Sequence, residues 1–351
     1  MPEILLLTLS AVICGAESWN DIELFGYSKL AFLQRILPFK NGIPSDDTLR
    51  RFFRAIEPAK FQHLFMEWIT KWLNPEVANK VIAIDGKTLC GSHDAGQLPI
   101  HLVSAFASEM GIVLGQIKTA EKSNEITAIP ELLEWLDVSG AIVTIDAMGC
   151  QKVIAEKIVA RGGDYLIALK GNQSHLHEDV KLYFEQPPHS AQTGMQFAET
   201  IDKGHGRIEI RRCRLSTDIE WLRRLQPEWK SVKCIVAIES ERHQGEKLSR
   251  ETRYFIGSKQ EMIASQALAA VRLHWGIENQ LHWVLDMSFG EDQSRIRQHH
   301  APANVAVIRH AALNMIRQVK PERISIKKMR KLAGWDDTVL ASILGNSFLM
   351  R

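Results

Sequence analysis

The chain has 351 residues, of which 45% are hydrophobic and 24% charged, a composition typical of a folded globular protein with two or three packed units. A formal net charge of +2 does not by itself indicate a nucleic-acid-binding protein, so any phosphate contact has to come from local basic patches. The five cysteines are odd in number, far apart and never in a C-x-x-C pair, which argues against a zinc ribbon or a disulfide framework and fits a reducing cytoplasm.

Residues 1–75 predict an all-helical N-terminal domain. The apolar start at residues 4–16 is too short to span a bilayer and lacks the basic leader of a signal peptide, so we expect a buried helix and no membrane partner. Pro44 and Ser45, followed by two aspartates, predict the start of a further helix.

From residue 81 onward, short apolar runs alternate with amphipathic ones. Residues 108–111 predict a tight turn between two antiparallel strands, whereas the later strands need helical crossovers and are therefore expected to be parallel. This order predicts a mixed sheet covered by helices, whose first part occupies residues 76–174. The predicted strands are 81–85, 101–107, 111–119, 141–146 and 164–170.

The second half of the chain divides into three further predicted segments. Residues 175–257 interrupt the alternation and predict a β-rich insertion with a small sheet of its own. Residues 258–318 show a helical pattern and predict the second part of the α/β core. Residues 319–351 predict a short, basic, helical segment. The seven basic residues among 317–331 fit either a solvated helix face or a contact with phosphates.

Two aspartates share the same local context at the ends of predicted strands. Asp85 closes the run VIAID and Asp146 closes IVTID, and each is followed by a turn that contains glycine. An Asp at a strand end is often only a turn or cap residue, but ligand sites in open α/β sheets lie beyond the carboxyl ends of strands. If the first and fourth strands are neighbours, the two carboxylates need a cation between them, and oxygen ligands favour Mg²⁺ or Mn²⁺.

Glu278 is a third carboxylate, in the run HWGIENQLHWVLD at residues 274–286. Taken alone it is a solvated helix residue, but on a helix that crosses the sheet edge it would join the two aspartates at the same metal ions. His274, Glu278 and His282 share one helix face at a spacing of four, which leaves a zinc site as an alternative. A zinc site would leave the two aspartates unexplained.

Several segments together resemble the DDE insertion-sequence transposases, which have a ribonuclease-H-like core, and most closely their H-repeat-associated branch. The resemblance implies that Asp85, Asp146 and Glu278 form the catalytic, metal-binding triad. It implies two Mg²⁺ or Mn²⁺ ions, with Asp85 as the bridging ligand. The family usually begins with a further N-terminal segment, so we expect the helical domain here to be short. The segments are GAESWNDIELFG, NGIPSDDTLRRFF, AIDGK, TIDAMGCQ, GGDYLIALKGNQ, HGRIEIR, HWGIENQLHWVLDMSFGED and RHAALNMIR.

The fold class implied is α/β, namely a ribonuclease-H-like mixed sheet with flanking helices, a β-rich insertion and an all-helical N-terminal domain. The function implied is DNA transposition by metal-dependent strand cleavage and strand transfer. The implied partners are the element ends and target DNA, bound by a homo-oligomer in the cytoplasm at the nucleoid. Two alternatives stay open: a catalytically inactive DNA-binding remnant, and a phosphohydrolase with an Asp nucleophile. The second is disfavoured because Lys87 stands where such enzymes carry another Asp.

The candidate DNA-contacting residues all have a structural alternative. The arginines near residue 50 also fit the basic side of an amphipathic helix, and residues 170–173 also fit a polar loop. Strand alternation places Arg207 and Arg211 on one face with Glu209. Tryptophans at helical spacing, Trp275 and Trp283, are more typical of a core than of a base-stacking surface, so only Trp275 is retained. The candidates are Arg50, Arg51, Arg54, Lys170, Asn172, Gln173, Arg207, Arg211, His274 and Trp275.

Related transposases carry Tyr, Arg and Lys at three further positions of the helix that bears the Glu. This chain has Val271, His274 and Leu285 there. The phosphate contacts that the family makes with those side chains are therefore expected to come from elsewhere in this chain.

Overall fold

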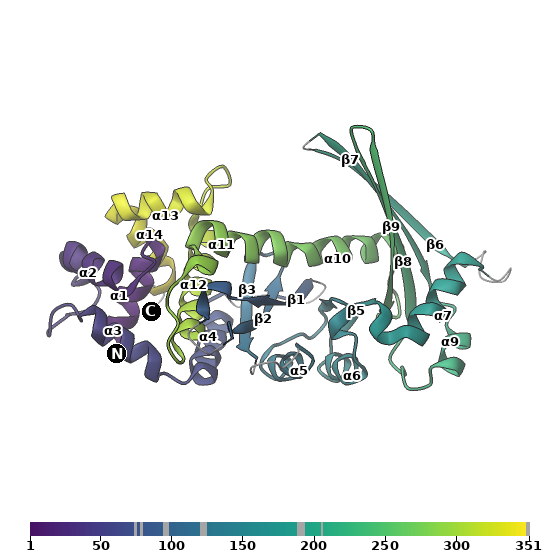
Figure 1. Ribbon diagram of the computed structural model, residues 1–351, viewed down its shortest axis with the longest axis horizontal. Coiled ribbons are helices and arrows are strands. Elements are labelled where there is room, and N and C mark those ends of the chain that lie inside the picture. Colours follow the sequence, from purple (N-terminus) through teal and green to yellow (C-terminus); the bar gives the residue numbers. More distant parts are fainter. Residues whose placement is uncertain are drawn as a thin grey trace.

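The structure is a computed structural model that describes residues 1–73, 76–77, 80–93, 98–119, 125–187, 194–204 and 206–348. A long mixed sheet with helices on both faces forms its centre, and further helices gather beyond one end of that sheet (Figure 1). Among the helices so described, none is long and apolar enough to cross a membrane. The predicted boundary at residue 75, and residues 349–351 of the C-terminal segment, lie outside the described residues.

The secondary structure follows the predicted order through the first half of the chain. The strands are β1 (Val81–Thr88), β2 (His101–Ala107), β3 (Ile112–Lys118), β4 (Ile142–Ile145), β5 (Asp164–Leu169), β6 (Gln196–Gly204), β7 (Arg207–Ser216), β8 (Cys234–Gln244) and β9 (Lys247–Gly257). The α-helices are α1 (Pro2–Ile13), α2 (Trp19–Leu33), α3 (Asp46–Ala55), α4 (Pro58–Leu73), α5 (Glu125–Trp135), α6 (Lys152–Ala160), α7 (Ser174–Glu185), α9 (Glu220–Leu225), α10 (Ala264–Gly276), α11 (Trp283–Phe289), α12 (Ala301–Val319), α13 (Ile326–Trp335) and α14 (Asp337–Phe348).

The first five strands form the core of the sheet in the spatial order β3-β2-β1-β4-β5. β1, β4 and β5 are parallel, and β2 is antiparallel to both of its neighbours. Gly111, with φ of 66°, completes the turn from β2 to β3, and its amide donates to the carbonyl of Ala107 at 2.8 Å. This order and these directions are those of a ribonuclease-H-like sheet. The predicted fold class is confirmed.

The β-rich insertion continues this sheet instead of forming one of its own. β9 pairs antiparallel with β5, and β8, β7 and β6 follow outward, so that the described strands form a single nine-stranded sheet. The prediction of a separate small sheet is therefore wrong. The physical reason is that the last, apolar part of β9, from Tyr254 to Gly257, fills the free edge of β5.

Helices cover the two faces of the sheet with different partners. On one face, Val81, Ile142 and Leu166 of the three parallel strands pack against α10 residues that include Ala267 and Leu268. α5 and α6 lie on the other face, and α10 runs across the strands from the insertion to the core (Figure 1). α10 therefore connects the insertion with the end of the sheet at which β1 and β4 finish.

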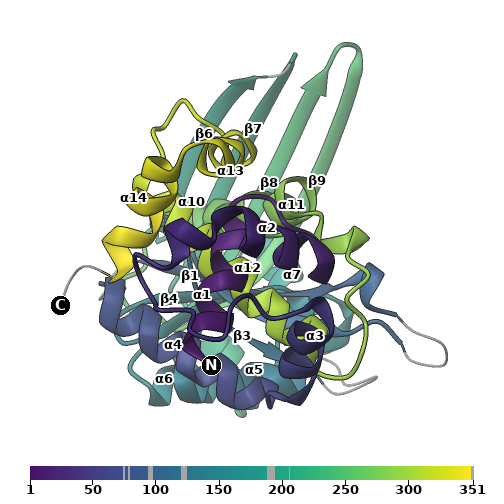
Figure 2. The ribbon, with the colours of Figure 1, turned by 90° about the vertical axis from the view of Figure 1, so that its left-hand side faces the viewer.

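The N-terminal and C-terminal helices pack together as one group (Figures 1 and 2). The Asn304 amide of α12 donates to the carbonyls of Phe53 and Ile56 at 2.8 and 2.9 Å, which ties the end of α3 to α12. Lys29 of α2 forms an ion pair with Asp337 of α14 at 2.6 Å. Ser45 accepts a hydrogen bond from the Thr48 amide, so the predicted helix start at this residue is confirmed.

Two residues of the basic C-terminal stretch bind main-chain carbonyls: Arg330 is buried in this group, and Arg317 is half-buried against the sheet. The Arg330 guanidinium donates to the Val12 carbonyl at 2.8 Å and lies 4.1 Å from the centre of the Phe289 ring. Arg317 donates to the carbonyl of Gly111 and lies over the Phe106 ring at 5.3 Å. For Arg330, neither a solvated face nor a phosphate contact applies, because its guanidinium group satisfies a main-chain carbonyl inside the protein. Arg317 is half-buried, and its guanidinium group is likewise occupied by a main-chain carbonyl.

The edge strand β3 is closed by one side chain of α12. The Asn314 carbonyl accepts a hydrogen bond from the Val113 amide, and the Asn314 amide donates to the Val113 carbonyl, both at 2.9 Å. Asn314 is fully buried. An exposed strand edge invites pairing with another chain, and this side chain satisfies both main-chain groups of Val113 as a neighbouring strand would.

We expect Asn314→Ala to lower the free energy of unfolding by about 2–4 kcal/mol, because it leaves a buried donor and a buried acceptor of β3 without partners. Urea denaturation monitored by circular dichroism measures the change. Asn20→Ala, at an exposed position of α2, is the matched control and should stay within about 0.5 kcal/mol of the wild type. An equal effect of both variants would contradict the proposed role of Asn314.

Candidate active site

Asp85 and Asp146 lie at matching positions of two neighbouring strands. β1 and β4 are parallel, and their register ends with Ile84 beside Ile145, so each aspartate is the next residue on its own chain. Neighbouring strands are about 4.8 Å apart, which brings the two side chains to the same edge of the sheet. The predicted adjacency of the first and fourth strands is confirmed. The expectation that Asp85 ends its strand is wrong, because β1 stays paired with β2 as far as Thr88, whereas Asp146 directly follows the end of β4.

Asp146 also has the local role of a cap. Its Oδ1 accepts hydrogen bonds from the amides of Met148 and Gly149, at 2.8 and 3.4 Å, at the start of a short 3₁₀ turn (Ala147–Gly149). These bonds hold the carboxyl group at the strand end. Two further side chains fix the same loop, since the Asn172 amide donates to the Ala147 carbonyl at 2.6 Å and the Gln173 amide donates to the Cys150 carbonyl at 2.8 Å.

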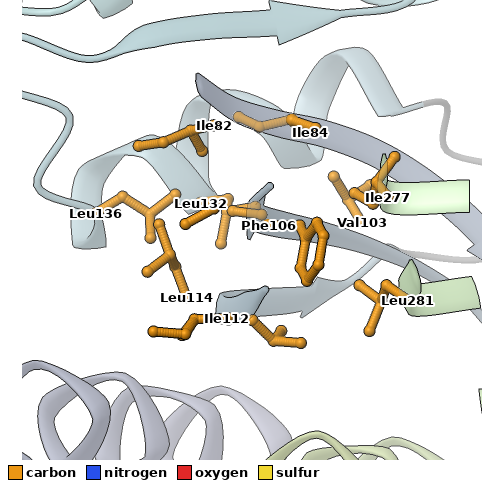
Figure 3. Close-up of a cluster of buried hydrophobic side chains, with 14 of the residues drawn as sticks. Ile82, Ile84, Val103, Phe106, Ile112, Leu114, Leu132, Leu136, Ile277 and Leu281 are labelled. Carbon is orange, nitrogen blue, oxygen red and sulfur yellow. The ribbon is translucent and has the colours of Figure 1, made fainter. Parts of the chain in front are cut away.

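Glu278 lies in a π-helical segment (Ile277–His282) between α10 and α11. Ile277 and Leu281 are fully buried and belong to the same hydrophobic cluster as Val103 and Phe106 of β2 (Figure 3), whereas Glu278 is exposed beside them. π-helical turns are rare and are frequently found at functional sites. The wider turn presents Glu278 next to the row of side chains that anchors the helix to the sheet.

The two histidines on either side of Glu278 contact β4 and β1. His274 Nδ1 lies 3.0 Å from Thr144 Oγ1 on β4, and His282 Nδ1 lies 3.6 Å from Asp85 Oδ2 on β1. Burial, followed by the charge of Lys87, lowers the pKa of His282 to about 3, so this ring is neutral and its contact with Asp85 is not an ion pair. Burial also lowers the pKa of His274, against the opposing effect of Asp146.

Asp85 is the most perturbed carboxyl group of this region. Its pKa is raised from the ordinary 3.8 to about 7, chiefly by burial, then by the charge of Glu125, with smaller contributions from Asp146 and Glu278. Both predicted partners therefore lie near enough to interact with Asp85 electrostatically. Within the described part of the chain, no Lys or Arg lies within ion-pair distance of any of the four carboxylates, namely Asp85, Glu125, Asp146 and Glu278.

The nearest cation on β1 is engaged elsewhere. Lys87 Nζ forms ion pairs with Asp286 of α11, with Glu291 at 3.1 Å and with Asp292 at 3.8 Å. Burial alone would lower the pKa of Lys87, but Glu291 and Asp286 raise it above its ordinary value. Arg309 of α12 approaches Glu291 at 3.5 Å and completes a buried cluster. This cluster joins the strand that carries Asp85 to the helix that follows Glu278.

A fourth acidic residue, which the sequence did not reveal, stands at the same edge. Glu125 begins α5, and its Oε1 lies 3.0 Å from His101 Nε2. A Glu in the first turn of a helix is ordinarily explained by the helix dipole, so its position in the sequence gives no signal of a site. Only the fold brings it next to β1.

The donor set fits a hard divalent cation in type. The groups gathered at the strand ends are carboxylates, and the raised pKa of Asp85 indicates a place where a cation would favour the ionised form. Over the residues that the structure describes, no three Asp, Glu, His or Cys side chains converge closely enough to hold a metal ion. Asp85, Asp146 and Glu278 share one edge and interact, but they do not converge on one point.

Several candidate DNA-contacting residues are engaged in ion pairs. Arg211 pairs with Asp202 at 2.7 Å and with Glu209, and Arg207 pairs with Glu209 at 2.8 Å, so the predicted shared face is confirmed. Lys170 is exposed beside the loop that holds Asp146.

The three N-terminal arginines lie together on α3. Arg50 pairs with Asp46 at 3.0 Å and Arg51 with Asp47 at 2.9 Å, each across one helical turn, and Arg54 is half-buried on the same helix. Such exposed pairs contribute little to stability, so these side chains can exchange partners at low cost.

The tryptophans of this helix are surface residues. Trp275 is 41% exposed and Trp283 is 60% exposed, so the expectation of a core position is wrong for both. Ile277, Leu281 and Leu285 occupy the inward positions instead. The Arg253 guanidinium lies 5.4 Å from the centre of the Trp275 ring.

Comparison with known proteins finds relatives along nearly the whole chain. The chain is 42% identical over 351 residues to "Putative transposase YncI" of Escherichia coli O157:H7, covering 99% of this chain and 89% of that protein. It is 42% identical over 360 residues to "H repeat-associated putative transposase YhhI" of Escherichia coli K12, covering 99% and 93%. Among solved structures, a piggyBac transposase synaptic complex with hairpin DNA matches with a TM-score of 0.44 and 11% identity, over 99% of this chain and 72% of that one.

Two family models cover most of the sequence. The model described as "DDE_Tnp_1-associated" matches residues 1–69, and the model described as "Transposase DDE domain" matches residues 78–315. The second match includes Asp85, Asp146 and Glu278. On these matches and on 42% identity along nearly the whole chain, the protein belongs to the DDE transposase family.

Proposed function

We propose that the protein catalyses metal-dependent DNA strand cleavage and strand transfer for an insertion sequence. The observation that carries the proposal is the register of β1 and β4, which sets Asp85 and Asp146 at one edge of the sheet, in a member of the DDE transposase family. Its substrates would be the element ends and target DNA, bound by a homo-oligomer at the nucleoid in the cytoplasm.

Asp85, Asp146 and Glu278 would hold two Mg²⁺ or Mn²⁺ ions, with Asp85 as the shared ligand. When bound, such ions activate water or a 3′ hydroxyl and stabilise the attacking and leaving oxygens of the phosphate. The side-chain amides of Asn172 and Gln173 hold the loop that follows Asp146 by donating hydrogen bonds to its main-chain carbonyls. His282 lies 3.6 Å from Asp85 and is neutral, so it would not compete with a metal ion for the negative charge of that carboxylate.

The DNA would follow the surface around this edge. Lys170, exposed just after β5, and His274 and Trp275, on the helix that leads to Glu278, are proposed to contact the reacting strand, together with the amides of Asn172 and Gln173. Arg207 and Arg211 of the insertion, and Arg50, Arg51 and Arg54 of α3, are proposed as phosphate contacts farther away. Most of these arginines would exchange an intramolecular carboxylate for a phosphate, so their effect on affinity should depend on salt.

A second candidate function is that of a DNA-binding protein without catalytic activity. Its support is that the three acidic side chains do not converge on a common point in the described residues. The phosphohydrolase alternative loses support, because Lys87 is held by Asp286 and Glu291 and does not face Asp85 as a partner. Strand cleavage measured on DNA with element ends separates the transposase from the inactive alternative.

We expect Glu278→Gln to reduce strand cleavage by more than about 100-fold, since changes to groups that merely support metal ligands already cost 10–100-fold. The variant keeps the size of the side chain and changes only its charge. Cleavage of labelled end-containing DNA in Mg²⁺ or Mn²⁺ measures the effect, and DNA affinity in Ca²⁺ should stay near that of the wild type. Cleavage within a small factor of the wild type would remove Glu278 from the site.

We expect the pH dependence of stability, measured by urea unfolding in EDTA, to distinguish the wild type from Asp85→Asn. The folded protein holds the Asp85 pKa near 7, above the ordinary 3.8, so the folded state favours the protonated carboxyl group. Between these two values the unfolded state binds fewer protons, and stability falls as the pH rises. Asp85→Asn should therefore be the more stable protein at pH 8, and the difference should vanish below about pH 4. A difference that is constant with pH would contradict the raised pKa.

A further inference from the structure

Glu125 is tied to the end of β1 through His101. Thr88 closes β1 and pairs across the strands with His101, the first residue of β2. His101 Nδ1 lies 2.9 Å from Thr88 Oγ1, and its Nε2 lies 3.0 Å from Glu125 Oε1. One ring therefore links the strand that carries Asp85 to the first residue of α5. The side chains of His101 and Glu125 are 27% and 17% exposed.

Gly86, the residue directly after Asp85, provides the space for this contact. A Cβ atom at Gly86 would lie 2.0 Å from Glu125 Oε1 and 2.3 Å from His101 Nε2. Gly86 is not among the glycines with positive φ, so the backbone conformation does not require glycine here. The close approach of Glu125 to the main chain beside Asp85 does require it.

The carboxylate of Glu125 lies against the main chain of Gly86, the residue that follows Asp85. Its charge acts on the Asp85 carboxyl group more strongly than the charges of Asp146 and Glu278 do. Its oxygen is engaged with His101, as is common for an acidic ligand or ligand-supporting group at a metal site. A second carboxylate brought against a buried Asp costs stability unless a cation is shared between them.

We propose that Glu125 is a fourth acidic residue of the catalytic centre and supplies an oxygen ligand to the divalent cation that Asp85 binds. This inference rests on the proposed function. In it, His101 orients the Glu125 carboxylate by a hydrogen bond from outside the metal site, and Gly86 leaves room for it. The four carboxylates would then come from β1, the end of β4, the π-helical segment and the start of α5.

The test measures the binding of Mn²⁺ to the full-length protein by isothermal titration calorimetry, together with the melting temperature in EDTA. Glu125→Gln should weaken Mn²⁺ binding about tenfold or more, and it should raise the melting temperature in EDTA because one like charge leaves the cluster. If Glu125 served only to hold His101, its substitution would not both weaken Mn²⁺ binding and raise the melting temperature in EDTA. Glu131→Gln, at an exposed position of the same helix, is the matched control and should leave both unchanged.

Gly86→Ala provides a second, independent perturbation. The added methyl group should displace Glu125 and weaken Mn²⁺ binding while all four carboxylates remain in the chain. Asp85→Asn serves as the reference for the proposed function, because it should abolish the binding that Glu125→Gln weakens. Wild-type Mn²⁺ affinity in Glu125→Gln, with loss of binding in Asp85→Asn, would overturn the role of Glu125 alone. Wild-type affinity in both variants would overturn the proposed metal site as well.

Discussion

The parallel pairing of β1 with β4 is the constraint on which the rest of the active-site region depends. It sets Asp85 and Asp146 side by side, and β4 ends at that point while β1 continues to Thr88, so the turn that follows Asp146 is free to carry supporting groups. The same pairing brings two like charges together in a half-buried place, at a cost in stability. The surrounding contacts hold that arrangement: the amides of Met148 and Gly149 bind Asp146, and buried helices cover the strands.

The helix across this edge is shaped by the spacing of its apolar residues. Ile277, Leu281, Leu285 and Phe289 are all buried and recur every fourth residue. In an α-helix of 3.6 residues per turn, such a row would rotate by about 40° at each step and leave the sheet. A π-helical turn has more residues than an α-helical turn and so offsets this rotation. The apolar row therefore stays on the inward side, and Glu278 lies beside it at the edge of the sheet. The exposed tryptophans are the other consequence of the same spacing.

The predictable parts of the fold are those in which burial leaves a pattern in the sequence. The runs that became β1 to β5 are short, apolar and bounded by turns, and both aspartates could be found because they end such runs. β6 could not be found, since its side chains alternate between exposed and half-buried and include few apolar groups. The continuity of the sheet was missed because the pairing of β5 with β9 joins residues nearly ninety positions apart. Glu125 was missed because its neighbour Asp85 is supplied only by the folded sheet.

The placement of Lys87 explains how the acidic edge keeps its character. A lysine two residues after Asp85 on the same strand points to the same face of the sheet and would be the natural counter-ion of that aspartate. Asp286 and Glu291 hold its ammonium group instead, and Arg309 approaches the same Glu291. The cluster thereby fastens the end of the Glu278 helix to β1 and keeps the lysine away from Asp85. What remains beside Asp85 is a neutral histidine and other carboxylates, an environment in which a divalent cation gains more than a protein side chain could offer.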